Sequence, residues 1–491
     1  MLNLISDPWI PVITRSGEKL CIAPWQIADA DILRPDWPRA DLNIACLELL
    51  IGLIYMADPP ADLPEWRNRQ AADSGRLRAK LELYIPAFNL IGPGPAFLQD
   101  RDPLSGDANN IDMLFIDSAG GNTAKNNADI LVHRGRYARL DPALAAMALY
   151  AFQAHAPSGG AGNRTSMRGG GPLVTLIDPG EGASLWDLVW ANVPYGVPSD
   201  LEDLPWMRAT KVSDAKGSES FPPDGRVFSV EAFFGMPRRL RLVSDDQGVT
   251  GVIQRPYGTN YALWKHPLSP YYRMKAAEEW LPVHPKPGHF GYRNWLGILA
   301  RARDSEMSER AQVLRQWHDR GRGREQAATV IVAGWAMSNM KPLDFIYARQ
   351  PFISEDLSLE LVGLIEAASD AALALRGALT SVLAEGEARE LERERFYLET
   401  EPGLLSCMGR LRAGEDPQQV SESWRMMLRD QVTGQFNGHA LPGLQMAESD
   451  VIQRIIGAQR GLNATMAGYG KLGETFFDKL GLELPKKGKA A

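Results

Sequence analysis

The last third of the chain carries a helical period of apolar residues. Apolar side chains recur every three to four positions from Leu357 to Val382, the spacing of one buried face of an α-helix. Similar stretches follow at about 387–411, 417–436 and 444–467, with breaks at Gly386, 414–417 and 442–443. Helices of comparable length joined by short loops are typical of an antiparallel four-helix bundle. We therefore expect such a bundle over residues 354–491.

The first 353 residues alternate short apolar runs with turns. The apolar run 42–55 behind Asp41 predicts a helix with an aspartate N-cap, and a second helical pattern covers 64–85. The run from Thr329 to Ala336 is apolar and rich in β-branched residues, which is typical of a buried strand. We expect an α+β protein, with a mixed α/β N-terminal domain containing long loops over residues 1–353 and the helical bundle after it.

A glycine-rich loop covers residues 153–171 and contains two arginines but no acid. It lies between a predicted helix at 142–152 and a predicted strand at 172–177. Glycine lets another molecule approach the main chain closely, and N–H groups beside arginine suit phosphates or base-edge acceptors. A flexible surface connection is the alternative. A nucleotide P-loop is not indicated, because its GxxxxGK[ST] order is absent.

A second segment, residues 86–135, is mostly loop. Long irregular segments within compact domains are usually functional or disordered. Lys125 lies here among small polar residues, a setting that suits contacts with phosphate and ribose 2′-hydroxyl groups.

Composition narrows the class of protein. The chain has 491 residues, more than one domain requires, and its hydrophobic fraction of 45% is that of a soluble globular protein. No apolar run approaches the ~20 residues that span a bilayer, and the N-terminus lacks a basic signal-peptide region, so we expect a cytoplasmic protein without membrane contact. The net charge of −7 argues against coating nucleic acid by bulk electrostatics but allows a local basic groove.

Motifs for catalysis and metal binding are missing from the sequence. It contains no CxxC, HxxxH, HExxH or GxSxG pattern, and its three cysteines lie far apart. We therefore expect no metal, no cofactor and no enzymatic activity. An enzyme built from residues distant in sequence stays open as an alternative.

The order of several short motifs resembles the CasA or Cse1 family, the large subunit of the type I-E CRISPR surveillance complex Cascade. The motifs that carry this resemblance run from Asn3 to Val12, Ala156 to Gly170, Phe234 to Arg239, Gln254 to Gly258, Trp264 to Pro270 and Gly334 to Lys341. Each is weak alone, but together they span nearly the whole chain.

The resemblance implies a non-catalytic, antiviral role in recognising the protospacer-adjacent motif (PAM) of double-stranded DNA from the minor groove. It implies that a glycine loop and a cation read the PAM, while a wedge splits the duplex and starts the R-loop. The residues carried over are Gly159, Gly160, Ala161, Gly162, Asn163 and Arg164 for the loop, Arg255 for the cation, and Ser338, Asn339 and Met340 for the wedge. Relatives often carry glycine at the position of Ala161, and a cysteine cluster present in one relative is missing here, so we expect no zinc.

The resemblance also implies partners. The loop at 120–127 corresponds to a family loop that contacts the 5′ end of the CRISPR RNA, here through Asn122, Thr123, Lys125 and Asn126. Expected protein partners are the backbone, 5′-handle-binding and small subunits of Cascade, and a separate helicase-nuclease that the family recruits. Two alternatives stay open: a hydrolase using the 153–171 loop, and a scaffold subunit without DNA contact.

Overall fold

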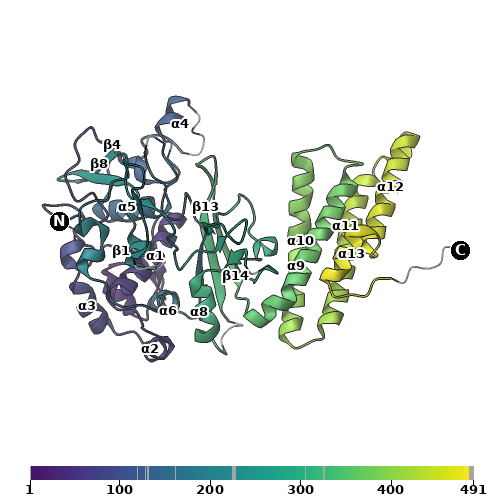
Figure 1. Ribbon diagram of the computed structural model, residues 1–491, viewed down its shortest axis with the longest axis horizontal. Helices are drawn as coiled ribbons and strands as arrows, with labels where there is room; N and C mark the ends of the chain where they lie inside the picture. Colours follow the sequence, from purple (N-terminus) through teal and green to yellow (C-terminus); the bar gives the residue numbers. More distant parts are fainter. Residues whose placement is uncertain are drawn as a thin grey trace. The chain divides into compact units, whose positions relative to one another are not determined.

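The computed structural model describes residues 2–118, 120–127, 129, 132–160, 162–223, 228–304, 306–323 and 327–485. The chain forms two compact units (Figure 1). Unit 1 comprises Met1–Gly288 and Glu306–Phe352, and unit 2 comprises His289–Ser305 and Ile353–Ala491. Unit 1 contains small sheets and helices and unit 2 is helical, which confirms the expected α+β class.

Unit 1 holds four three-stranded antiparallel sheets and one parallel strand pair among the described residues. Their orders are β2-β1-β3, β4-β8-β7, β14-β13-β5 and β11-β10-β12, with β6 beside β9. The strands are β1 Ile10–Thr14, β2 Lys19–Ile22, β3 Ile32–Pro35, β4 Asn109–Asn110, β5 Val174–Asp178, β6 Glu219–Ser220, β7 Arg239–Asp245, β8 Gly248–Arg255, β9 Asn260–Tyr261, β10 Tyr271–Tyr272, β11 Leu281–Pro282, β12 Ser308–Glu309, β13 Thr329–Ser338 and β14 Lys341–Pro351.

The helices of unit 1 include α1, which provides much of the core. They are α1 Ala40–Ala57, α2 Leu63–Asn68, α3 Ser74–Glu82, α4 Gly121–Lys125, α5 Pro142–His155, α6 Leu185–Ala191, α7 Val230–Phe234 and α8 Gln312–Arg320, with 3-10 turns at Pro24–Ala28, Ile85–Ala87, Ile111–Leu114, Leu201–Asp203 and Pro205–Met207. Among the described helices, α1 alone is long and apolar enough to cross a membrane, but α3, α5, α6 and α7 pack around it and bury most of its side chains. It is therefore the core helix of unit 1.

Two predicted features near α1 were wrong in detail. The N-cap is Arg39 rather than Asp41, because Asp41 lies in the first turn and pairs with Arg39 at 2.8 Å. The helical pattern at 64–85 divides into α2 and α3, since Asp73 caps a new helix by accepting from the N–H of Arg76.

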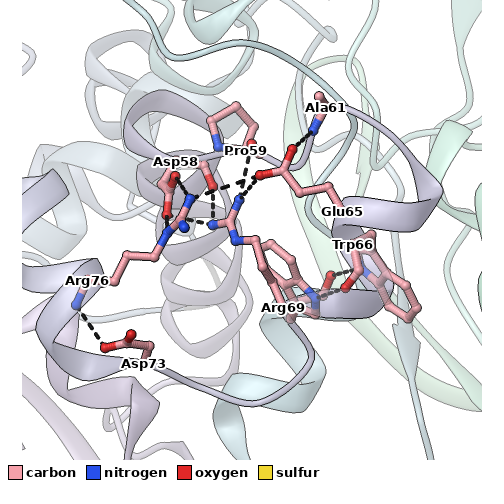
Figure 2. A network of polar contacts seen from close by, with 9 residues as sticks. Asp58, Pro59, Ala61, Glu65, Trp66, Arg69, Asp73 and Arg76 are labelled. Carbon is pink, nitrogen blue, oxygen red and sulfur yellow. Dashed lines mark hydrogen bonds and ion pairs between the residues drawn. The ribbon is translucent and has the colours of Figure 1, made fainter.

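The C-terminal end of α1 is held by an ion-pair network (Figure 2). Asp58 is the C-cap residue, and its carboxylate accepts from Arg69 at 2.6 Å and from Arg76 at 2.7 Å. Arg69 also lies over the ring of Trp190, 4.8 Å from its centroid, and pairs with Glu65 at 2.9 Å. The network ties α2 and α3 to the end of the core helix.

In the described part of unit 2, four long helices are followed by a fifth, shorter one that the apolar pattern did not predict. They are α9 Glu355–Leu379, α10 Glu387–Arg412, α11 Pro417–Ala440, α12 Ser449–Met466 and α13 Gly470–Lys479, with 3-10 turns at Tyr292–Asn294 and Leu444–Met446. Helix α9 packs against each of the other four.

Residues 289–305 belong to unit 2, although the expected boundary at 353/354 assigned them to the N-terminal domain. The reason is aromatic burial. The ring of Tyr292 lies edge-on to Tyr397 and Trp424, with centroids 5.4 and 6.3 Å away, and its hydroxyl bonds to Thr400 at 2.7 Å. These contacts join a distant segment to the core of the helices, which local sequence patterns do not reveal.

Candidate nucleic-acid interface

The glycine-rich loop connects α5 to β5, in the helix–loop–strand order that the sequence predicted. Its tip is a tight turn: the N–H of Gly159 donates to Asn163 O at 3.2 Å, and the N–H of Asn163 donates to Gly160 O at 2.8 Å. Gly160 and Gly162 have φ of +65° and +80°, values that L residues rarely adopt. Gly159 and Gly160 are exposed, and Ala161 lies outside the described residues.

The end of β8 and the residues just after it run along this turn. The N–H of Tyr257 donates to Gly162 O at 2.8 Å, and the Gln254 amide donates to Asn163 Oδ1 at 3.0 Å. A Cβ at Gly162 would lie 2.6 Å from the ring of Tyr257, so glycine is required by close approach as well as by φ. Tyr257 is 41% exposed and presents an aromatic ring beside the turn, a feature that the sequence reasoning missed.

The other limb of the loop packs on the β13–β14 hairpin. A Cβ at Gly170 would lie 2.6 Å from Pro157 Cα and 3.2 Å from Met337 Sδ. A Cβ at Gly171, whose φ is +64°, would lie 2.3 Å from the carbonyl oxygen of Trp335. Glycine at these positions brings the loop into direct contact with the end of the hairpin that carries residues 338–340.

The tip of the hairpin is a two-residue turn with Asn339 and Met340 at φ of +48° and +62°, as in a type I′ turn. Ser338, Asn339 and Met340 are exposed, and Met340 is 53% accessible. Met337 is half-buried against the glycine loop. The polar pair and one apolar side chain therefore project from the tip, while the neighbouring methionine packs inward.

Pro342 lies inside regular structure, just after the hairpin tip. Strand β14 begins at Lys341 and runs through Pro342 to Pro351. Pro342 pairs with Met337 at a register shift, and β14 is an edge strand of its sheet. Proline is tolerated in both settings, because its missing N–H need not join a central ladder.

The two arginines proposed for DNA contact have different surroundings. Arg164 donates to Ser213 Oγ and Ser213 O, both at 2.8 Å, so its guanidinium is already bound to another part of the protein. Arg255 is exposed and donates to Ser105 Oγ at 3.3 Å. Neighbouring strand residues point to opposite faces, so Arg255 faces Ser105 while Gln254 faces the glycine turn.

Arg238 bridges the two limbs of the glycine loop at its neck, where Pro157 and Arg164 lie. The sequence reasoning did not single it out as a site residue. Its Nε donates to Arg164 O at 2.6 Å and its Nη2 to Pro157 O, so one guanidinium holds both limbs. It lies over the Phe152 ring, 5.2 Å from the centroid. Burial lowers the pKa of Arg238 to about 10. Since this value is still well above 7, the guanidinium is charged at neutral pH.

The loop at 120–127 is held by a separate set of contacts between residues that flank it. Asp117 accepts from Arg136 at 2.6 Å and from Arg39 at 3.0 Å, and the Phe115 and Tyr137 rings stack with centroids 4.8 Å apart. Within the loop, α4 ends at Lys125. Thr123 is half-buried, Lys125 and Asn126 are exposed, and the main chain of Asn122 lies in α4.

The family described as CRISPR-associated protein Cse1 matches residues 3–435, which include the glycine loop, the Gln254–Tyr257 segment and the β13–β14 hairpin. The chain belongs to the Cse1 family.

Solved structures of Cse1 proteins have the same fold. The chain matches Thermobifida fusca Cse1 with a TM-score of 0.70 and 19% identity, over 98% of each chain. It matches a Thermus thermophilus CasA with a TM-score of 0.68 and 18% identity, over 94% of this chain and 98% of that one. A chain of a solved CRISPR RNA-guided surveillance complex matches with a TM-score of 0.60 and 14% identity, over 94% and 99%.

A cavity of about 280 Å³ lies beside the loop of this Cse1 chain, lined in part by Thr165, Ser166, Tyr261 and His284. Thr165 and Ser166 donate their hydroxyls to the carbonyls of Ala156 and Gly169. Burial lowers the pKa of His284. These hydroxyls serve the shape of the loop, so the cavity does not favour the hydrolase alternative. Within the described ranges, no three His, Cys, Asp or Glu side chains gather closely enough to hold a metal ion.

Proposed function

We propose that this chain is the non-catalytic large subunit of a type I-E Cascade complex, in which it recognises the PAM of double-stranded DNA from the minor groove. One observation carries the proposal: the Gln254–Tyr257 segment and the β13–β14 hairpin both contact the glycine-rich loop whose tip is the 159–163 turn. Family membership supports the same role.

The chemistry of the turn suits a permissive minor-groove reader. The minor groove offers mainly a distinction between A·T and G·C pairs. Two exposed glycines present main chain without side-chain bulk, so the backbone of the turn can approach the base edges. Arg255 supplies the neighbouring cation, and Asn163 belongs to the same proposed DNA contact. Ala161 is assigned to it from the family resemblance and lies outside the described residues.

The hairpin tip is the proposed wedge. Ser338 and Asn339 bond to base edges as they unpair, and Met340 lies against the exposed base pair. Separating a base step costs a few kcal/mol, which strand capture and guide pairing offset. The rigid strand pair β13–β14 supports the tip while it does so.

The remaining parts of the proposal concern partners. Asn122, Thr123, Lys125 and Asn126 contact the 5′ end of the CRISPR RNA, and other surfaces bind the backbone, 5′-handle-binding and small subunits and recruit the helicase-nuclease. The long helices α9–α12 form an antiparallel four-helix bundle with α13 packed on α9 and α12. The assembly acts in the cytoplasm.

Gly160 provides the sharpest test. A Cβ at this position meets nothing within 4 Å, and its φ of +65° is one that Asp and Asn tolerate best among L residues. Gly160→Asp should therefore fold, but its carboxylate should repel phosphate and weaken binding of a PAM-bearing duplex by the assembled complex at least about tenfold. Gly160→Asn is the matched control, with the same shape and no charge.

Binding is measured by gel shift over a range of salt concentrations. We expect Gly160→Asn to retain most of the affinity that Gly160→Asp loses, with the difference shrinking as salt rises. Equal, unchanged affinity in both variants would remove the glycine turn from the DNA site. Absence of salt-dependent binding in the wild-type complex would favour the scaffold alternative.

A further inference from the structure

A buried carboxylate lies beneath the glycine loop. Glu48 is in the middle of the apolar helix α1, and its exposure is 0%. Its Oε1 accepts from His155 Nε2 at 2.7 Å, and its Oε2 accepts from Arg168 Nη2 at 2.7 Å. Each carboxylate oxygen therefore has its own charged or polar partner.

These two partners are the two ends of the loop. His155 is the last residue of α5, and Arg168 lies just before the glycines that pack on the hairpin. The N–H of Ser166 donates to Ala156 O at 3.0 Å, and the N–H of Gly171 donates to His155 O at 2.9 Å, so the main chain closes the same neck. One side chain on the core helix thus contacts both limbs from below.

The surrounding groups fix the orientation of Arg168. Its Nη1 donates to Ser269 Oγ at 3.1 Å, and the ring of His266 lies 3.8 Å from Glu48 Oε2. The Nδ1 of His266 accepts from the N–H of Leu268 at 3.2 Å, so its Nε2 carries the proton that faces Glu48. Arg168 therefore has little freedom to rotate while Glu48 is charged.

Core stability alone does not call for such a network. Buried ion pairs lose much of their Coulombic gain to desolvation, and well-packed apolar residues often replace them at no cost. What apolar residues do not supply is direction, because a carboxylate holds its donors at defined angles and distances.

We infer that Glu48 is a positioning residue of the glycine loop, which holds His155 and Arg168 so that the 159–163 turn keeps one shape against the duplex. The inference rests on the proposed function for its role in DNA binding. Its structural half, a loop shape fixed by Glu48, can be measured without DNA.

The chain offers a control at the C-terminal end of the same helix. Asp58, the C-cap residue of α1, is also a buried acid that accepts from two partners, Arg69 and Arg76 of Figure 2, but it lies in the network with α2 and α3. Glu48→Gln and Asp58→Asn each replace one carboxylate by an amide of nearly the same shape. Both substitutions remove the charge of a buried carboxylate that accepts from arginine, one beneath the glycine loop and one away from it; Arg69 keeps Glu65 as a partner after Asp58→Asn, so the comparison uses loop exchange and not global stability.

Hydrogen exchange of the full chain at the amides of Gly159 and Asn163 reports the loop, and gel shift of the assembled complex reports PAM-duplex affinity. Glu48→Gln should speed exchange at both amides by about tenfold or more, since it breaks charge-assisted bonds at the neck. It should also lower affinity about tenfold and narrow the preference for PAM over non-PAM duplex. Asp58→Asn should leave loop exchange and affinity as in the wild type.

Wild-type exchange in Glu48→Gln, or equal effects of the two substitutions, would overturn the inference. Faster exchange with unchanged duplex affinity would support the positioning role and overturn the assignment of the loop to DNA. If Glu48→Gln does not fold, Arg168→Lys keeps the pair charged but lacks the fork that reaches Glu48 and Ser269 together. Its loop exchange should exceed that of the wild type, and an unchanged rate would again refute the role of Glu48.

Discussion

Replacing Gly171 by alanine should expose how tightly the loop and the hairpin are joined. Gly171 has a φ of +64°, and a Cβ there would lie 2.3 Å from Trp335 O and 2.8 Å from Trp335 Cβ. Gly182 is the matched control, with a φ of +82° and no atom within 4 Å of an added Cβ. Both substitutions place alanine in the left-handed region, but only one also creates a clash.

The two costs can be separated by subtraction. The left-handed conformation of an L residue costs about 1–2 kcal/mol, which is the whole expected effect of Gly182→Ala. Overpacking adds about 1–3 kcal/mol, so Gly171→Ala should lower the free energy of unfolding of unit 1 by about 2–5 kcal/mol. The opposing atom belongs to the main chain of β13, which is paired with β14 at Trp335 and cannot rotate away as a side chain would.

Hydrogen exchange in increasing urea reads the two units separately. Amides of Val330 to Ala333 in β13 report unit 1, and amides in the middle of α11 report unit 2. We expect a loss in β13 for both variants, larger for Gly171→Ala, and no change in α11. Equal losses in the two variants would mean that the loop limb moves freely away from Trp335, and the close approach would then carry no mechanical link to the hairpin.

The remaining predictions concern pH, the cation and the wedge. Burial, followed by the charge of Arg168, lowers the pKa of His266 well below 6.5, so the unfolded chain takes up the proton first. The stability that depends on neutral His266 is therefore fully present above pH 6.5, and the free energy of unfolding of unit 1 should fall by about 1 kcal/mol per pH unit below it. Urea unfolding at about pH 7.5 and pH 5.5 measures this slope. His266→Gln should reduce it. Arg255→Ala should weaken duplex binding and flatten its salt dependence by about one counterion in gel shifts, and if neither quantity moves, the cation lies elsewhere. Asn339→Ala with Met340→Ala should leave PAM binding nearly intact but slow strand opening on linear DNA, followed by base-analogue fluorescence, and a pre-melted bubble should restore the rate; wild-type opening in the double variant would exclude the wedge role.

The pH response has a second stage at lower pH. Burial alone would raise the pKa of Glu48, but Arg168, His155 and His266 outweigh it and hold that pKa well below its ordinary value of 4.5. The stabilisation from Glu48 is therefore present above pH 4.5 and is lost as pH falls below it. The contacts of Glu48 with His155 and Arg168 should be lost at this stage.

Local pattern in the sequence determined the secondary elements and the candidate segments. The apolar period of Leu357 to Val382 predicted α9, and the glycine-rich run predicted a helix–loop–strand connection, because both follow from main-chain geometry within a few residues. The lone acid Glu48 in the apolar run 42–55 was a readable signal of a buried polar contact, but nothing in its neighbourhood named its partners.

Tertiary structure alone decided which of these segments meet. Glu48 and Arg168 are 120 residues apart in sequence, and Gly171 of the glycine loop contacts Trp335 of the distant strand β13. Neither contact leaves a trace in local periodicity. The assignment of residues 289–305 to unit 2 has the same cause, since Tyr292 is buried by rings from α10 and α11. Burial and hydrogen bonding act between whatever surfaces the fold brings together, whereas sequence patterns record only what each residue does to its immediate neighbours.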